Sequence, residues 1–124
     1  MINPTLNPPP HSRLTIIQKL ISSYKLWQEF LRHFPKASRY TLGEKIDSLF
    51  IETLELVLTA SYLPKNGKTP IIEKAILKTD LIKFFLQITW EVKAVKTSQY
   101  ALLSEKLDEI GRMLMGWARQ SSLK

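Results

Sequence analysis

The chain has 124 residues, of which 44% are apolar and 23% charged, so it is long enough for one domain with a hydrophobic core. This composition excludes a disordered chain and a collagen-like fibre, and the lack of cysteine excludes disulfides, thiolate metal sites and cysteine catalysis. The 18 Lys and Arg outnumber the 11 Asp and Glu, which gives a net charge of +7. Such an excess favours an anionic partner, a nucleic acid first and an acidic membrane surface second. No apolar stretch is long enough to span a bilayer and the first residues do not resemble a secretory signal, so we expect a soluble, cytoplasmic protein without membrane contact.

Prolines divide the chain. Four of the seven lie in the first ten residues and predict a flexible, proline-rich arm over 1–12, followed by a helical domain over 13–121. The other three, Pro35, Pro64 and Pro70, fall where helices should begin or end. Between these marks apolar residues recur at intervals of three and four, which is helical and not strand spacing.

The spacing predicts helices over 14–34, 41–63, 70–96 and 98–120. Because the connections between them are short, neighbouring helices should be antiparallel, and the expected fold is an all-α, up-down-up-down four-helix bundle. The buried seam of the first helix is expected to consist of Ile17, Leu20, Tyr24, Trp27, Leu31 and Phe34.

Local signals mark the helix starts. Thr41 and Glu44 have the spacing of a capping box at the start of the second helix. Pro70 suits the first position of the third helix, where its missing N–H is harmless, and Ser98 is a cap residue for the fourth. Gly111 lies inside the fourth helix, where we expect it to permit close contact with another helix.

Residues 81–90 are unusually apolar for a helix of a bundle. On a helical wheel their seven apolar side chains cover an arc of roughly 240°, wider than the stripe that one bundle helix buries. A heavily packed central helix would explain this arc, but a four-helix bundle has no central helix. We therefore expect a subunit interface of a homo-oligomer that includes Phe84, Ile88 and Trp90.

No motif for catalysis, nucleotide binding or metal binding is present, and we expect no enzymatic activity, metal or cofactor. A di-iron carboxylate site needs Glu-x-x-His on two helices, but Glu29 and His33 are four residues apart and His11 lies in the arm. His33 is best explained as a helix-end residue. Glu52 and Glu55 are expected to be solvated surface acids.

Folding the bundle gathers basic residues at its two ends. Dipole compensation at helix C-termini explains Arg32, Lys93, Lys96 and Arg119. It does not explain the four cations expected in connections, Lys36, Arg39, Lys65 and Lys68. Tyr40 and Tyr62 flank these clusters and suit either stacking on bases or packing at a helix end. We expect binding of RNA or an RNA–DNA hybrid without sequence specificity. The predicted contact residues are Arg32, Lys36, Arg39, Lys65, Lys68, Lys74, Lys93 and Lys96.

Four segments have a distinctive sequence: Phe34-Pro35-Lys36, the run from Arg39 to Ile46, Phe84-Phe85-Leu86 with Trp90, and the run from Leu107 to Leu114. Together they resemble the accessory variability determinant (Avd) proteins of diversity-generating retroelements. The similarity covers residues 14–120. The Avd proteins belong to a wider group of four-helix-bundle proteins, among them those encoded by intervening sequences of bacterial 23S rRNA genes. The acidic and apolar stretch over residues 46–62 is more similar to the Avd branch.

This resemblance implies a homopentameric barrel with a positively charged surface. It also implies association with the element's reverse transcriptase and with nucleic acid, in support of mutagenic retrohoming of a template RNA through cDNA. Five chains of +7 would carry a formal charge of +35. The alternative is a stand-alone four-helix-bundle oligomer of the rRNA intervening-sequence type, with a structural or RNA-associated role. A reverse transcriptase gene beside this one would distinguish the two.

Overall fold

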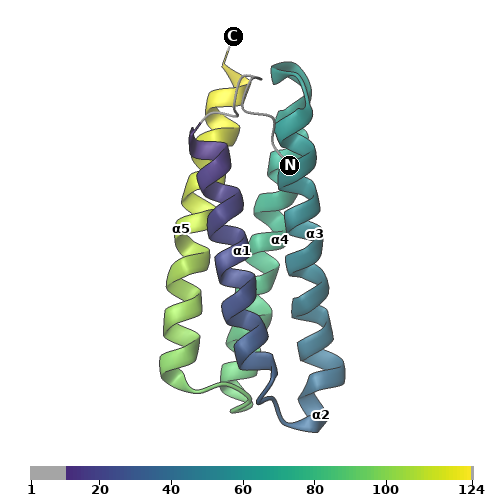
Figure 1. The fold of residues 1–124 in the computed structure, drawn as a ribbon, viewed down its shortest axis with the longest axis vertical. Helices are drawn as coiled ribbons and strands as arrows, with labels where there is room; N and C mark the ends of the chain where they lie inside the picture. The colour runs from purple at the N-terminus through teal and green to yellow at the C-terminus, as the bar shows by residue number, and fades with distance from the viewer. Residues whose placement is uncertain (1–10, 124) are drawn as a thin grey trace.

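The structure, a computed structural model, describes residues 11–123, with side chains from residue 15 onward. Four long helices form a bundle: α1 (His11–Leu31), α3 (Glu44–Tyr62), α4 (Lys65–Glu91) and α5 (Thr97–Ser122). Successive long helices run in opposite directions, and the described residues contain no strand (Figure 1). Helix α4 packs most extensively, against α3 and α5, while α1 closes the bundle by packing against α5 and α3. The predicted all-α, up-down-up-down bundle is therefore confirmed.

The second helical segment begins earlier than predicted. Short α2 (Lys36–Ser38) and the π-helix η1 (Arg39–Gly43) directly follow Pro35 and lead into α3. The predicted capping box is wrong because these residues are already helical: the Thr41 hydroxyl donates back to the carbonyl of Ser38 at 3.3 Å. Helix α1 ends at Leu31, three residues before its predicted end, and Pro35 with an extended ψ of 142° is the N-cap of the segment that follows.

The third and fourth helices also differ from the prediction at their ends. Helix α4 begins at Lys65, just after Pro64, so Pro70 lies inside the helix rather than at its first position. There its missing N–H removes one hydrogen bond near the helix start. Helix α5 is capped at Lys96, whose N–H donates to Gln99 Oε1 at 2.9 Å, and not at Ser98.

A Schellman turn ends α4 at Glu91, five residues before the predicted end. The Lys93 N–H donates to the Trp90 carbonyl at 3.0 Å, and the Ala94 N–H donates to the Thr89 carbonyl at 2.7 Å. This turn requires a left-handed residue at its centre, and Lys93 supplies it with φ 66°. Glycine normally occupies this position, since a side chain makes the conformation less favourable.

The core consists of two clusters stacked along the bundle. One is rich in aromatic residues, including Trp27, Phe34 and Phe50, and the other is mainly aliphatic. Small buried hydroxyl residues lie between the clusters on three helices: Ser23, Thr53 and Thr79. Within the predicted seam of α1, Ile17, Tyr24 and Leu31 are only half-buried, and Ile16, Ser23 and Phe30 are buried beside them.

Two glycines differ from each other in their surroundings. A Cβ added at Gly111 would meet no atom within 4 Å, so the prediction that this glycine permits close helix contact is wrong. The close approach is at Gly43 instead, where a Cβ would lie 2.7 Å from Leu31 Cδ1.

Residues 1–10, which contain most of the predicted arm, lie outside the described residues, and α1 begins at His11, inside the range predicted for that arm. None of the helices over residues 11–123 is both long and apolar enough to cross a membrane.

Candidate nucleic-acid interface

Lysines in the middle of the bundle are paired with carboxylates of neighbouring helices. Lys19 of α1 pairs with Glu109 of α5 at 3.3 Å, and Lys83 of α4 pairs with Asp108 of α5 at 2.6 Å. Lys78 of α4 pairs with Glu52 of α3 at 3.0 Å, so Glu52 is an ion-pair partner and not simply a solvated acid. These lysines are paired within the fold, and the predicted contact residues lie toward the two ends of the bundle.

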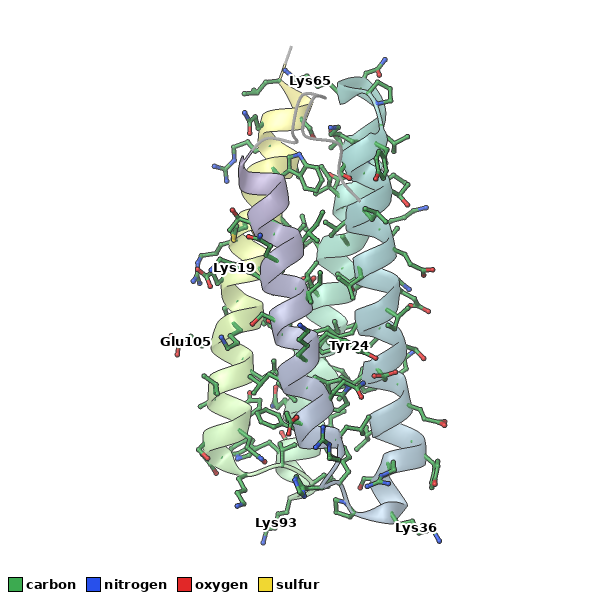
Figure 2. The ribbon with its side chains drawn as sticks, viewed as in Figure 1. Lys19, Tyr24, Lys36, Lys65, Lys93 and Glu105 are labelled. Atoms are coloured by element: carbon green, nitrogen blue, oxygen red, sulfur yellow. The ribbon has the colours of Figure 1, made fainter. Side chains whose placement is uncertain are left out.

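One end of the bundle is formed by residues 32–40 and 90–99, and we call it the groove end. Figure 2 shows Lys36 and Lys93 at this end, and Lys65 at the opposite end. The predicted contact residues here are Arg32, Lys36, Arg39, Lys93 and Lys96, so the structure brings these five together at one end. At the opposite end are Lys65, Lys68 and Lys74, near the start of α4.

Three cations occupy helix N-termini rather than connections. Lys36 is the first residue of α2, Lys65 is the first residue of α4, and Lys96 is the N-cap of α5. The prediction that Lys96 compensates a helix C-terminus is therefore wrong. A cation at a helix N-terminus faces the positive end of the macrodipole, which is unfavourable by about 0.3–1 kcal/mol. All three are exposed, and none forms an ion pair with another residue of the described range.

Two of the predicted contact residues, Arg39 and Lys68, have side chains that contact other parts of the fold. Arg39 donates from Nη2 to the carbonyls of Arg32 at 3.0 Å and Phe34 at 3.5 Å, so it caps the C-terminus of α1. Lys68 is only 8% exposed, and its Nζ lies 5.7 Å from the ring centroid of Trp117.

The other predicted contact residues are exposed. Lys74 lies on the outer side of α4, and Lys93 lies in the turn after it. Arg32 pairs with Glu29 at 3.0 Å on the surface of α1, an exposed pair of small energetic weight. Lys124 and the side chain of Arg13 lie outside the described part.

A groove of about 1090 Å³ opens at the groove end, between the connection that follows α1 and the connection between α4 and α5. The sequence interpretation did not find it, since its walls come from residues far apart along the chain. Its lining consists of Phe30, His33, Pro35, Trp90, Glu91, Lys93, Ala94, Val95, Lys96, Thr97 and Gln99.

Trp90 lines this groove and is 37% exposed, whereas Phe30, another aromatic residue of the lining, is buried. Its indole stacks on Tyr100 with ring centroids 5.0 Å apart and an interplanar angle of 10°. Its Nε1 donates to Thr97 Oγ1 at 3.0 Å, so a residue of α4 is fixed against α5. Trp90 was predicted at a subunit interface, and the structure places it on the groove.

The outer side of α4 carries an apolar stripe made of Leu77, Leu81, Phe84 and Ile88. Phe84 is 55% exposed and packs edge to face on Phe85 at 5.3 Å, while Ile88 is half-buried. The wide apolar arc of this helix therefore leaves apolar surface that the bundle itself does not cover.

The remaining candidates are placed as follows. His33 is exposed on the wall of the groove, and the residues described contain no group of three or more acidic or histidine side chains that could hold a metal ion. Tyr40 and Tyr62 are both largely exposed, so neither packs at its helix end.

A family model described as bAvd-like matches residues 14–121 of this chain. The match confirms the resemblance that the sequence segments indicated. No curated protein sequence matches the chain.

Proposed function

Because this chain belongs to the bAvd-like family, we propose that it is a non-enzymatic accessory protein of a diversity-generating retroelement. In this role it binds the element's reverse transcriptase together with template RNA or its cDNA, and so supports mutagenic retrohoming in the cytoplasm. It needs no cofactor for this role, because it positions other molecules and does no chemistry of its own.

The observation that carries this proposal is the exposed cations at helix N-termini. Lys36, Lys65 and Lys96 lie where the dipole disfavours them and where the described residues supply no carboxylate within 4.0 Å. Phosphate would reverse this penalty, since it binds both the ammonium group and the free N–H groups of a helix N-terminus. Arg32 and Lys93 add exposed cations at the groove end and Lys74 adds one at the opposite end, whereas Arg39 and Lys68 make contacts within the fold.

The assembly proposed for this role is a homopentamer. The stripe of Leu77, Leu81, Phe84 and Ile88 supplies apolar surface of the kind that subunit interfaces bury. Five copies repeat the basic ends around a closed ring, which increases the local density of phosphate contacts. Light scattering should give a mass several times that of one chain, and a monomer would contradict the assembly.

Charge reversal at the helix N-termini tests nucleic-acid binding without unfolding the protein. Lys36→Glu, Lys65→Glu and Lys96→Glu place acids at helix starts, where the dipole favours them, so the fold should be retained. The matched control is Lys25→Glu, Lys106→Glu and Arg112→Glu on the sides of the bundle, which also lowers the net charge from +7 to +1. Affinity for RNA should fall much more in the first variant. Its log–log salt slope should decrease by about 2, since each phosphate contact contributes about 0.7 for single strands.

Equal losses in the two variants would show that net charge alone drives binding, and would remove the role of the helix N-termini. Binding of the reverse transcriptase is measured separately, by co-purification of the two proteins from cells that express both. A wild-type chain that neither binds RNA in a salt-sensitive manner nor co-purifies with the polymerase would overturn the proposed function.

A further inference from the structure

The groove at the groove end has an aromatic surface that is already fixed in place. Tyr100 covers one face of the Trp90 indole, and Tyr100 does not line the groove. Because Tyr100 occupies one face, stacking of a ligand ring from the groove would use the other face of the indole. The hydrogen bond from Nε1 to Thr97 holds the ring between α4 and α5. A surface that is fixed before binding loses little conformational entropy when a flat ring stacks on it.

The charges around this indole favour a phosphate. Lys93 and Lys96 line the same groove, and neither forms an ion pair with any residue between 11 and 123. Glu91 also lines it, so the two lysines and one glutamate leave the lining with one formal positive charge in excess, and the Glu91 carboxylate accepts a hydrogen bond from Gln87 Nε2 at 2.9 Å. The N-terminus of α5, whose first N–H groups have no intrahelical acceptor, borders the groove at Thr97.

Lys93 adds an independent observation. Its left-handed backbone, with φ 66°, is a conformation that glycine would adopt with less strain, yet the residue there is a lysine that lines the groove. Unfavourable backbone conformations that persist in a fold often mark binding sites. The strain therefore agrees with a role for this ammonium group that the turn itself does not require.

We propose that this groove binds an unpaired nucleotide of a single-stranded nucleic acid, with the base stacked on Trp90 and a phosphate held by Lys93 and Lys96. The inference rests on the proposed function and assigns one specific contact site to it. A groove of about 1090 Å³ is large enough for a nucleotide. Bases in a duplex are already stacked on both sides, so a duplex can reach this site only through its phosphates.

Two substitutions at Trp90 separate stacking from packing. Trp90→Leu removes the aromatic face, and Trp90→Phe keeps an aromatic face but removes the hydrogen bond to Thr97. We expect Trp90→Leu to weaken binding of oligo-uridine and oligo-deoxythymidine roughly 5- to 150-fold, which corresponds to the usual effect of losing one stacked base. Trp90→Phe should retain most of the affinity, and binding of an RNA–DNA duplex of equal length should be the same in both variants.

Charge removal tests the phosphate contacts. Lys93→Gln with Lys96→Gln should lower the log–log salt slope for single strands by about 1.4, whereas Lys25→Gln, an exposed lysine in the middle of α1, should leave the slope nearly unchanged. This decrease in slope with either oligo-uridine or oligo-deoxythymidine supports the groove as a nucleotide site. The ratio of the two affinities shows whether RNA or DNA is preferred.

Tryptophan fluorescence gives a readout that needs no loss of affinity. Trp27 and Trp117 are buried, so Trp90 is the accessible indole, and a base stacked on it should quench part of the wild-type emission. Trp90→Phe should abolish this quenching. No quenching in the wild-type chain, or equal affinity of Trp90→Leu and Trp90→Phe for single strands, would overturn the groove as a nucleotide site.

The failure of this inference is distinguishable from failure of the proposed function. Salt-sensitive binding that Trp90→Leu leaves unchanged would show that the groove is not a nucleotide site. The proposed binding of nucleic acid by the basic surface would still stand. A change in oligomer mass in Trp90→Leu with unchanged single-strand affinity would show that another subunit covers the groove, which also overturns the inference. Loss of all binding in the wild-type chain would remove both.

Discussion

The two halves of the bundle are built from different residues. The groove-end half has an aromatic core in which Trp27 packs edge to face on Phe34 at 5.3 Å and stacks on Phe50 at 6.3 Å. The other half is packed mainly with aliphatic residues and includes alanines such as Ala60 and Ala75. Large rings bury more apolar area per residue than aliphatic side chains, so the groove-end half has more stabilising surface per residue.

The left-handed residue and the unpartnered buried nitrogens lie in that same half. Within residues 11–123, the non-glycine residue with positive φ is Lys93, and the buried side-chain nitrogens without a partner are Trp27 Nε1 and Arg39 Nε. Each of these features lowers the free energy of unfolding, so stability alone does not explain its presence. The comparison teaches that the aromatic core supports the end that contains the groove and the strained turn at Lys93, whereas the aliphatic core supports the end that carries Lys65, Lys68 and Lys74.

The largest expected effect comes from the aromatic core. We expect Phe50→Ala to lower the free energy of unfolding by about 3–5 kcal/mol, because it leaves a cavity beside Trp27. Val57→Ala, the matched change in the aliphatic half, should lower it by about 2 kcal/mol, since fewer methyl groups are lost. Urea unfolding followed by circular dichroism measures both. Equal decreases in the free energy of unfolding at the two positions would show that the aromatic core does not stabilise its half more than the aliphatic core does.

The glycines offer a second contrast between the halves. Gly111→Ala should raise the free energy of unfolding by about 1 kcal/mol, since alanine is the better helix former and nothing stands within 4 Å of the new Cβ. Gly43→Ala, near the groove end, should gain less or lose stability because Leu31 Cδ1 must move away from 2.7 Å. Thermal unfolding of both variants checks this, and equal gains would show that the contact at Gly43 imposes no constraint.

Lys93 allows stability and binding to be separated at one residue. Lys93→Gly should raise the free energy of unfolding by about 0.5–1 kcal/mol, because relief of the left-handed side chain outweighs the larger unfolded-state entropy of glycine. The same change should weaken RNA binding, since it removes a cation from the groove. Lys93→Arg is the control, which keeps the charge and the strain. A variant with glycine that is neither more stable nor weaker in binding would contradict the comparison.

Much of the fold follows from the sequence, because the helices have strong apolar periodicity and prolines near their ends. The boundaries were harder to predict. Pro35 and Pro64 each cap the helix that follows, so Lys36 and Lys65 belong to first turns and not to connections. Local pattern cannot show this, because either a loop or a helical turn can follow a proline.

The candidate site was predicted in part. Basic residues clustered at the ends as expected, since end positions follow from helix order and length. The groove could not be predicted, because it depends on how Pro35 and His33 approach the turn at Lys93. The burial of Lys68 against Trp117 likewise depends on tertiary packing between α4 and α5. Such contacts between distant segments have no signature in a single sequence.

The smallest expected effect is a pH dependence in the groove-end half. Gln28 Nε2 donates to Tyr24 Oη at 2.9 Å and to Asp47 Oδ1 at 2.6 Å, which links α1 to α3. Burial raises the pKa of Tyr24 above its ordinary value of 10.0. The hydrogen bond to Asp47 and the charge of Asp47 raise this pKa further. The phenol therefore ionises first in the unfolded chain, which then binds fewer protons than the folded chain, so stability falls as pH rises from about 10 through the raised pKa.

Tyr24→Phe removes this titration and isolates its effect from that of the lysines. The variant should be slightly less stable than the wild type at neutral pH, because the hydrogen bond from Gln28 is lost. Below about pH 9 the difference in unfolding free energy between the two proteins should be constant, since the tyrosine stays neutral in both states. Above pH 10 the difference should shrink, because only the wild type loses the contribution of its neutral phenol. Urea unfolding across this range measures it, and parallel curves would show that burial and Asp47 do not raise the pKa of Tyr24 in the folded chain.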